Sequence, residues 1–284
     1  MTDVRSFDRL SDAAVAGVLA LAAAAEQADG VYPLSEDTVF LVRQGSGAQV
    51  LAYDDGALVG YAGGGELVVH PFFRRRGVGT ALLGSLGEGP LAFWAHGDLP
   101  GAAALAEKTG FKRARVLWQM RRSLTDFSFE SVLPEGVTLR HFRPGHDEEA
   151  WLGVNSRAFA HHPEQGRWTL DDLRLREAAP WFDPAGFLLA VDISDKLLGY
   201  HWTKVHPPAG DDPALGEIYV LGVDPGGHRR GLGVALSVAG LRHLADTGLT
   251  QALLYVDESN SAAVALYRKL GFEIYKTDVN YQRG

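Results

Sequence analysis

The chain contains no cysteine among its 284 residues. Disulfide bonds, thiolate metal sites and a cysteine nucleophile are therefore all excluded. Long hydrophobic runs are lacking as well, and none approaches the roughly 18 apolar residues that a membrane-spanning helix needs. The longest apolar stretch near the start, residues 13–25, is rich in alanine and is typical of an amphipathic helix. We therefore expect no membrane-spanning segment and no membrane partner.

An excess of basic residues is also absent. The sequence has 27 lysine and arginine residues against 35 aspartate and glutamate residues, a formal net charge of −8. Because phosphate backbones recruit basic surfaces, nucleic acid is not expected as a partner, although a local basic cluster could still hold a phosphorylated cofactor. The first residues do not combine a basic segment with an apolar one, so we predict no secretory signal and a cytoplasmic location.

Two sequence blocks occur twice in the chain, in the same order. Residues 67–79 (LVVHPFFRRRGVG) resemble residues 221–233 (LGVDPGGHRRGLG), and residues 105–111 (LAEKTGF) resemble residues 266–272 (LYRKLGF). The separation is 154 residues for the first pair (221 minus 67) and 161 for the second (266 minus 105). Repeats this far apart predict a duplicated domain and not a solenoid of short units.

The boundary between the copies is predicted near residues 125–136, where a strand-like run gives way to Pro134-Glu135-Gly136. We therefore expect one domain at residues 1–130 and a second at residues 131–284. Strands that alternate with helices favour an α/β domain with a mixed sheet in each copy. The expected helices include residues 12–27 and 148–159, and the expected strands include residues 49–53, 56–63, 186–192 and 196–204.

A buried strand, a glycine-containing turn and a helix are predicted to follow one another in the second copy. Residues 218–223 are apolar and β-branched, and leucines at helical spacing follow the turn. Such a turn presents backbone N–H groups and the positive end of the helix dipole. Gly231 and Gly233 would let phosphate oxygens approach the main chain, and Arg229 and Arg230 add positive charge. The pattern therefore predicts a site for a diphosphate.

The hexapeptide His228–Gly233 resembles the motif (Gln/Arg/His)-x-x-Gly-x-(Gly/Ala) of the GNAT superfamily of N-acetyltransferases. It differs from the nucleotide P-loop, which needs Gly-Lys-Ser/Thr at its end, and from the Rossmann motif. The block Asn260–Phe272 strengthens the resemblance, which implies that Asn260 lies beside the pantetheine arm of coenzyme A and Tyr267 near the thioester sulfur. It also implies two tandem GNAT domains, each a mixed, mostly antiparallel sheet flanked by helices.

The resemblance implies acetyl-CoA as the cosubstrate. In the second copy it assigns as cofactor-binding residues Leu221, Gly222, Val223, His228, Arg229, Arg230, Gly231, Leu232, Gly233, Val234, Asn260, Ser261, Ala262, Ala263, Val264 and Ala265. In the first copy it assigns Leu67, Val68, Val69, Arg75, Arg76, Gly77, Val78, Gly79 and Thr80. A metal is not expected, because the adjacent side chains of His161 and His162 point in different directions and have no third ligand nearby.

Acetylation of an amine by a thioester is helped by a base, a polarised carbonyl and an acid for the departing thiolate. An α-amine has a reference pKa of about 8, so it is largely protonated at neutral pH. Glu217 is assigned as the base, acting through water, because superfamily members often place a carboxylate at this strand start; the alternative is a solvated residue at a strand end. Backbone N–H groups of residues 221–223 would polarise the carbonyl. Tyr267 is assigned as the acid, since a phenol with a pKa of about 10 can protonate a thiolate.

The first copy lacks these groups. The positions that correspond to Glu217, Tyr267 and Asn260 are occupied by Gly63, Ala106 and Leu99. The phosphate cradle is retained, with three consecutive arginines at residues 74–76. We therefore expect the first copy to be non-catalytic, and either to bind acetyl-CoA without turning it over or to serve as a scaffold for the acceptor site.

Two segments, residues 157–168 and 201–206, are unusual for a generic member of the superfamily. With the tandem arrangement they resemble, over essentially the whole chain, the actinobacterial tandem-GNAT enzymes that acetylate the cysteinyl amine of a cysteine–glucosamine–inositol conjugate. This resemblance implies acceptor contacts at Glu36, Glu164, Lys204, Glu217 and Tyr255, whose charged and polar groups suit a polyol. Glu36 could equally belong to a helix cap. The residues Trp168, Trp181 and Trp202 are expected in the core or in the wall of a pocket.

Two other functions stay open from the sequence. One is N-acetylation of another amine, such as an aminoglycoside or a protein N-terminus, and the other is non-catalytic sensing of acyl-CoA. A sensor leaves Glu217 and Tyr267 unexplained. An aminoglycoside predicts a strongly acidic groove, whereas Lys204 stands among the expected contacts. The partner expected is a small-molecule amine, and the chain is expected to be a monomer.

Overall fold

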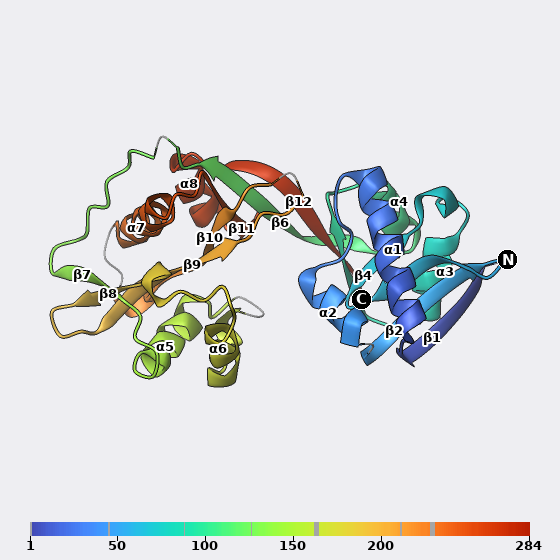
Figure 1. The fold of residues 1–284 in the computed structure, drawn as a ribbon, viewed down its shortest axis with the longest axis horizontal. Helices are drawn as coiled ribbons and strands as arrows, with labels where there is room; N and C mark the ends of the chain where they lie inside the picture. Colours follow the sequence, from blue (N-terminus) through green and yellow to red (C-terminus); the bar gives the residue numbers. More distant parts are fainter. Residues whose placement is uncertain are drawn as a thin grey trace. The chain divides into compact units, whose positions relative to one another are not determined.

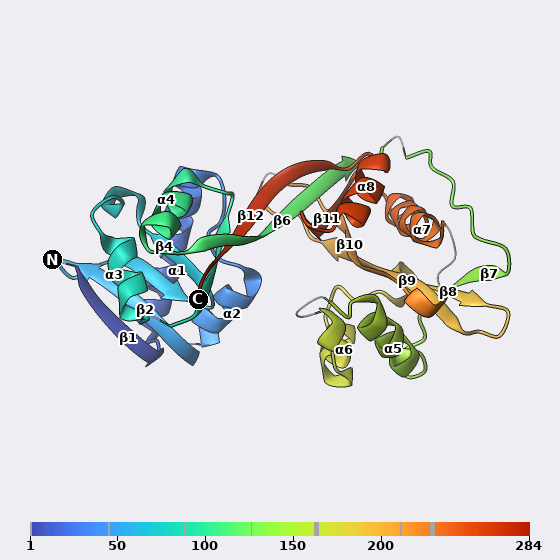
Figure 2. The ribbon, with the colours of Figure 1, turned by 180° about the vertical axis from the view of Figure 1, so that it is seen from behind.

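The computed structural model describes residues 2–44, 46–87, 89–125, 127–161, 165–210, 212–227 and 231–284, without the side chains of Glu36 and Ser46. The chain divides into two compact units. Unit 1 comprises Met1–Trp118, Asp257–Asn260 and Lys276–Gly284, and unit 2 comprises Gln119–Val256 and Ser261–Tyr275. Figures 1 and 2 show the elements of each unit from opposite sides.

Unit 1 is built on a mixed sheet. Its strands are β1 (Asp3–Arg9), β2 (Ser46–Asp54), β3 (Ala57–Gly63), β4 (Glu66–Val69), β5 (Leu91–His96), the first part of β6 (Lys112–Ser123) and most of β12 (Glu273–Arg283). β1 to β4 are antiparallel neighbours, whereas β4 pairs in parallel with β5. β12 pairs antiparallel with β5, from Asp278 opposite His96 to Arg283 opposite Leu91. The last strand of the chain thus belongs to the sheet of the unit that begins the chain.

Helices cover both faces of this sheet, namely α1 (Asp12–Asp29), α2 (Glu36–Gln44), α3 (Val78–Ser85) and α4 (Pro100–Lys108). Because side chains alternate across a strand, Leu51 and Tyr61 pack with α1 and α2 on one face. Val50 and Ala52 pack with α3 on the other face. The two views agree with this arrangement, since α1 lies in front of the sheet in Figure 1 and α3 lies in front in Figure 2.

Unit 2 repeats this plan. The strands β7 (Val137–His141), β8 (Phe187–Asp192), β9 (Leu197–His206) and β10 (Leu215–Val223) are successive antiparallel neighbours, and β10 pairs in parallel with β11 (Gln251–Asp257). The helices are α5 (Glu148–Ala158), α6 (Leu170–Glu177), α7 (Leu232–Asp246) and α8 (Ser261–Lys269). The prediction of two copies, each a mixed and mostly antiparallel sheet flanked by helices, is confirmed.

The core of unit 2 is rich in aromatic rings. Trp151 of α5 and Trp202 of β9 are fully buried. The ring of Trp202 stacks on that of Phe187 with a centroid distance of 4.4 Å. Trp168 and Trp181 are partly buried and pack against this cluster, so the tryptophans form core and wall as expected. Because an aromatic ring buries a large apolar area, the cluster holds β8, β9 and β10 firmly beneath α5 and α6.

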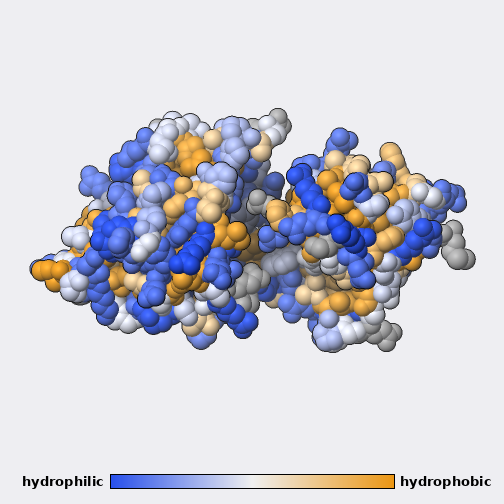
Figure 3. All heavy atoms as spheres, turned by 60° about the horizontal axis from the view of Figure 1, so that its bottom comes forward, coloured by the Kyte–Doolittle hydropathy of each residue, from blue (hydrophilic) through white to orange (hydrophobic). Residues whose placement is uncertain are grey.

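Several expected elements lie within a few residues of the observed ones. The helix expected at residues 12–27 is observed at Asp12–Asp29, and the strand expected at 196–204 is observed at Leu197–His206. The domain limits at residues 130 and 131 stay a prediction about the duplicated copies. Within the described ranges, no helix combines the length and the hydrophobicity needed to cross a bilayer. Figure 3 shows hydrophilic and hydrophobic residues intermixed on the face that it presents.

Candidate active site

Glu217 lies near the start of β10, and only 6% of the residue is exposed. Its Cα partner on the neighbouring strand β9 is Lys204. Its Oε2 lies 2.7 Å from Nε2 of His206, two residues further along β9. Because an ionised carboxylate can only accept hydrogen bonds, Nε2 is the donor. Glu217 therefore belongs to a carboxylate–imidazole pair that sequence reasoning did not assign. Side chains two residues apart on a strand point to the same face, so the sequence could have indicated that His206 shares a face with Lys204.

β10 departs from regular pairing shortly after Glu217. Its register with β9 shifts around Tyr219, which indicates a β-bulge at this residue. Its parallel pairing with β11 covers residues 216–218, although β10 itself continues to Val223. The remaining residues of β10 therefore lie beyond the ladder with β11. This geometry supports the prediction that N–H groups of residues 221–223 polarise a carbonyl.

The turn before α7 has the features of an anion site. Gly231 caps α7 with φ of 87° and ψ of −7°, a left-handed conformation that glycine adopts without steric penalty. The N–H of Ala235 bonds to the carbonyl oxygen of Gly231 at 3.0 Å, so the N–H groups of residues 232–234 come before the helical ladder. Among the described residues, no side chain caps this helix, and a Cβ on Gly231 would meet no atom within 4 Å. The helix end is therefore open to an anion.

The first copy repeats this cradle. Gly77 caps α3 with φ of 87° and ψ of −2°, close to the values at Gly231. Arg74, the first of the three arginines, has a structural role, because its guanidinium binds both carboxylate oxygens of Asp29 at 2.7 and 2.6 Å. The two cradles therefore share one backbone geometry.

The position predicted to carry the catalytic carboxylate differs between the copies. At Gly63, which corresponds to Glu217, a Cβ would collide with the hydroxyl group of Tyr61. At Ala106, which corresponds to Tyr267, a small buried residue of α4 fills the place of the phenol. The first copy thus has neither the side chain nor the space for a carboxylate at the position where the second copy carries Glu217.

The remaining predicted cofactor contacts fall on the elements expected of them. In the second copy, residues 261–265 form the first part of α8. Asn260 precedes this helix and donates its backbone N–H to the carbonyl of Asp257 at 3.0 Å. In the first copy, residues 67–69 lie on β4 and residues 78–80 begin α3. The structure thus places these contacts at a strand end and at two helix starts.

Tyr267 lies on the buried face of α8. Its ring meets Phe272 edge-on, with a centroid distance of 5.9 Å. Burial raises the pKa of Tyr267 well above the ordinary phenol value. The phenol is therefore fully protonated at neutral pH, as a proton donor must be, although the same burial makes it a weaker acid.

Cationic side chains lie over aromatic rings next to the bulge in β10. The Nζ of Lys204 lies 4.8 Å from the ring centroid of Trp181 and 5.4 Å from that of Tyr219. Arg176 of α6 lies 3.8 Å from the centroid of Trp168 and donates a hydrogen bond to the phenol oxygen of Tyr219 at 2.9 Å. Both arrangements are favourable cation–π contacts. The sequence predicted Lys204 as an acceptor contact but singled out neither Arg176 nor Tyr219, which lies between buried positions of β10.

Tyr255 of β11 is half exposed and belongs to a polar chain of side chains. Its phenol oxygen accepts a hydrogen bond from Nε2 of Gln119 at 2.6 Å, and Oε1 of Gln119 accepts from Nε of Arg121 at 3.1 Å. Arg121 in turn binds both carboxylate oxygens of Asp212 at 2.7 Å. The position of the predicted acceptor contact is therefore set by residues of β6 that the sequence did not single out.

Some predicted site residues lie outside the described part of the chain, namely His162, Glu164, His228, Arg229 and Arg230. Glu36 begins α2, although its side chain is not described. The hydroxyl of Ser35 accepts the N–H of Thr38 at 3.2 Å, so it is Ser35 that caps this helix. Among the described residues, no group of three or more potential ligands could hold a metal ion.

Unit 1 contains a charged cluster of its own. His96 of β5 lies between Glu66 of β4 and Asp278 of β12, with both nitrogen–oxygen distances at 2.9 Å. Burial opposes the charge on the ring, but hydrogen bonds and charges from Asp278 and Glu66 outweigh it and raise the pKa of His96 to about 9. The other oxygen of Glu66 accepts the N–H of Ser35 at 2.8 Å. Both ring nitrogens and both Glu66 oxygens therefore have partners within the unit.

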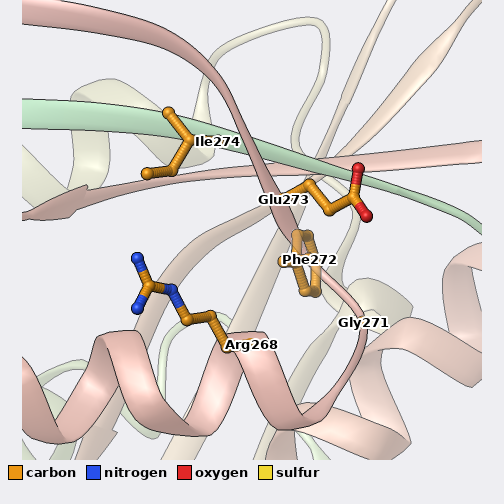
Figure 4. A pocket seen from close by; sticks show the side chains of 5 residues that line it. All are labelled: Arg268, Gly271, Phe272, Glu273 and Ile274. Carbon is orange, nitrogen blue, oxygen red and sulfur yellow. The ribbon is translucent and has the colours of Figure 1, made fainter.

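A pocket of about 380 Å³ lies at the end of α8. Figure 4 shows Arg268 of α8 and the residues Gly271, Phe272, Glu273 and Ile274 that lead into β12. None of the predicted catalytic or acceptor residues lines it. The pocket is therefore separate from the residues that the sequence predicts for the reaction.

Known proteins resemble the chain closely in sequence. The model of the Acetyltransferase (GNAT) family matches residues 150–272. The mycothiol acetyltransferase of Geodermatophilus obscurus is 57% identical, over 99% of this chain and 97% of the relative. The mycothiol acetyltransferase of Thermomonospora curvata is 54% identical, over 97% of this chain and 95% of the relative.

Solved structures resemble the chain in fold. A GCN5-related N-acetyltransferase from Sphaerobacter thermophilus aligns with a TM-score of 0.72 at 25% identity, over 99% of this chain and 95% of that chain. A tandem GNAT protein from the clavulanic acid biosynthesis pathway aligns with a TM-score of 0.71 at 21% identity, over 100% of this chain and 98% of that chain. The second likeness shows the fold alone.

The duplicated fold and the matched family define an acetyltransferase of the GNAT class. Within that class, the chain belongs to the family of mycothiol acetyltransferases. The family and the enzyme class expected from the sequence are confirmed. The roles of the individual site residues stay predictions.

Proposed function

We propose that the chain transfers the acetyl group of acetyl-CoA to the cysteinyl amine of a cysteine–glucosamine–inositol conjugate and so forms mycothiol. The observation that carries this proposal is the pair that the buried Glu217 forms with His206, together with the bulge that follows Glu217 in β10 and the anion site at the start of α7. Support for the acceptor comes from relatives named mycothiol acetyltransferases that are similar over nearly the whole chain. The cytoplasmic location and the monomeric state remain predictions.

The cradle fits a pyrophosphate. Among the described residues, no side chain caps the helix end that presents the N–H groups of residues 232–234, and a Cβ on Gly231 would meet no atom within 4 Å. When bound, acetyl-CoA supplies the activated acetyl group of the reaction. In this proposal Arg229 and Arg230 add charge to its phosphate site, and the backbone of residues 221–223 donates hydrogen bonds to the thioester carbonyl.

Two side chains handle protons in the proposed reaction. Glu217 helps to remove a proton from the acceptor ammonium, with water between them, and its buried hydrogen bond to His206 fixes the carboxylate. Tyr267 gives its phenol proton to the departing thiolate, for which its protonated state is suited. A positioned acid or base contributes roughly 10²–10⁴ in rate, so neither group needs to act alone.

The acceptor is proposed to contact Lys204 and Tyr255. The ammonium of Lys204 lies over Trp181 and Tyr219, so a sugar ring could lie beside aromatic faces while its hydroxyls bond to the charged group. Tyr255 is held by Gln119 at 2.6 Å and carries a phenol suited to a hydroxyl or amide. The resemblance adds Glu36 and Glu164 as further contacts.

The first copy is proposed to bind acetyl-CoA without turnover, or to act as a scaffold for the acceptor. The equal backbone conformation at Gly77 and Gly231 supports binding. The collision that a side chain at Gly63 would make with Tyr61 supports the absence of catalysis. Occupancy of the first cradle is open to equilibrium dialysis with acetyl-CoA, which should give two sites per chain if it binds.

Release of free coenzyme A tests the proposed function. The chain is incubated with acetyl-CoA and a panel that contains the cysteine–glucosamine–inositol conjugate, free cysteine, an aminoglycoside and a peptide with a free N-terminus. We expect the highest kcat/KM for the conjugate. A higher kcat/KM for the aminoglycoside or the peptide would contradict the acceptor, and no release with any amine would favour an acyl-CoA sensor.

A further inference from the structure

We propose that the imidazole of His206 takes the proton from the acceptor amine, and that Glu217 serves as the carboxylate that orients this ring. The inference rests on the proposed function and refines the role of Glu217 within it. Its basis is the geometry of the pair. Nε2 is held on the carboxylate at 2.7 Å, so Nδ1 on the other edge of the ring carries the lone pair.

Exposure separates the two members of the pair. The side chain of His206 is 32% exposed, whereas that of Glu217 is 8% exposed. Among the described residues, Nδ1 of His206 has no hydrogen-bond partner in its own unit. A ligand amine can therefore approach the imidazole edge, whereas the carboxylate is covered and already bonded to the ring. This division matches the Ser-His-Asp arrangement, in which a buried carboxylate fixes the tautomer and stabilises the imidazolium that forms.

Acid–base matching favours an imidazole for this step. In general a carboxyl group titrates near pH 4, an imidazole near 6.5 and an α-ammonium near 8. For these reference groups, the pKa difference between donor and acceptor is about 1.5 units for proton transfer from an ammonium to an imidazole and about 4 units for transfer to a carboxylate. General bases work best when their pKa lies near the working pH, so the imidazole is the better acceptor at neutrality.

The groups around His206 are compatible with this role. Lys204 lies two residues away on the same face of β9 and opposite Glu217, and its ammonium lies over the rings of Trp181 and Tyr219. Tyr219 of β10 has its phenol oxygen bonded to Arg176. In the loop after β9, Asp212 is bonded to Arg121. Glu217 is therefore the carboxylate bonded to the ring.

The proton balance of the reaction needs such a group. The ammonium gives one proton to Nδ1 of His206, and the free amine attacks the thioester carbonyl. The C–N bond forms, the C–S bond breaks, and the thiolate takes a proton from Tyr267, which regains one from the attacking nitrogen. The imidazolium then releases its proton to solvent through its exposed edge. In total, an ammonium and a thioester give an amide, a thiol and one proton.

The substitution His206→Gln tests the inference, because glutamine keeps an N–H donor for Glu217 but cannot accept a proton. We expect a loss of roughly 10²–10⁴ in kcat/KM for the acceptor near neutrality, with unchanged acetyl-CoA affinity. The loss should shrink as pH rises, because the amine is then neutral. In His206→Ala, added imidazole should restore activity at least tenfold, whereas Glu217→Ala should not respond. His146→Gln, at an exposed histidine, is the matched control.

Wild-type activity in His206→Gln over the whole pH range would overturn the inference, as would equal rescue of both alanine variants by imidazole. Thermal unfolding and acetyl-CoA binding identify a variant that has not folded, and His206→Asn then replaces it. The assay uses whichever amine the wild-type chain acetylates fastest. A failure of the proposed acceptor therefore shows in the wild type, whereas a failure of this inference shows only in the variants.

Discussion

Each of the two units has a buried glutamate that binds a histidine, but the surroundings of the two pairs differ. In unit 1, His96 lies between Glu66 and Asp278, and the second oxygen of Glu66 accepts the N–H of Ser35. In unit 2, His206 binds Glu217 through one nitrogen and is one third exposed. A carboxylate with all its partners within the fold can stabilise structure but cannot act on a ligand.

The two copies share the backbone conformation of the predicted cofactor cradle and differ in the side chains that the sequence predicts for chemistry. Gly77 and Gly231 have the same φ of 87° at the start of a helix. At the position that corresponds to Glu217, in contrast, a Cβ on Gly63 would collide with the hydroxyl group of Tyr61. Cofactor binding depends on backbone N–H groups, which survive substitution, whereas proton transfer depends on individual side chains, which do not.

The largest difference between the two copies is expected when the glycine before the helix of each cradle is replaced by aspartate. Both glycines have φ of 87°, so the conformational cost of Gly231→Asp and Gly77→Asp is matched. Gly231→Asp should weaken acetyl-CoA binding in unit 2 and abolish turnover, because like charges in contact cost several kcal/mol, a factor of roughly 10²–10³. Gly77→Asp should largely spare kcat. Calorimetry and CoA release measure both, and an equal loss of rate in two folded variants would contradict the division of roles.

The second largest effect is expected from removal of the phenol group of Tyr267, which the first copy lacks. Tyr267→Phe should lower kcat by a factor of roughly 10² or less, since a positioned acid contributes in this range. The loss should not recover as pH rises, because a higher pH supplies no acid. Binding of acetyl-CoA, measured by calorimetry, should change little. A rate that returns to the wild-type value at high pH would contradict the assignment of Tyr267 as the acid.

The cluster in unit 1 should act on stability. The pKa of His96 is raised to about 9 from 6.5, so its contribution is complete below about pH 6.5 and is lost as pH rises through 9. His96→Gln should lower the free energy of unfolding at pH 6 by about 3 kcal/mol at most, from 1.36 kcal/mol per pH unit. The difference from the wild type should vanish above pH 9. Denaturant titrations at both pH values measure it, with His141→Gln as an exposed control.

The smallest effects should appear at the acceptor contacts of unit 2. Lys204→Met should raise the acceptor KM about tenfold, because a hydrogen bond to a charged group contributes about 1.5 kcal/mol or more. The KM for acetyl-CoA should not change. Steady-state kinetics with Lys196→Met, an exposed lysine in the turn that precedes β9, provide the comparison. A change in the acetyl-CoA KM alone would place Lys204 at the cofactor instead.

The sequence predicted the features that repeat or that follow a strict period. The blocks around Gly77 and Gly231 gave the duplication and the cradle, because a glycine turn before a helix constrains the sequence directly. The alternation of strands and helices gave the fold class. The predicted position of Glu217 at a strand start is observed, and its burial matches a functional residue better than a solvated one.

The sequence could not predict partners that meet through the fold. His206 and Glu217 are eleven residues apart, and only the pairing of β9 with β10 brings them together. The pairing of β12 with β5 is a longer example, because it brings Asp278 to His96 across 182 positions of the chain. Such contacts depend on register and strand order, which short motifs do not encode.

A crossed comparison of two substitutions tests the central claim, that catalysis belongs to the second copy and that the first uses its glutamate for structure. Glu217→Gln should lower kcat by roughly 10²–10⁴ near neutrality, recover at higher pH, and leave the melting temperature nearly unchanged. Glu66→Gln should lower the melting temperature and retain most of kcat. A wild-type rate in Glu217→Gln together with an inactive but fully folded Glu66→Gln would contradict the account.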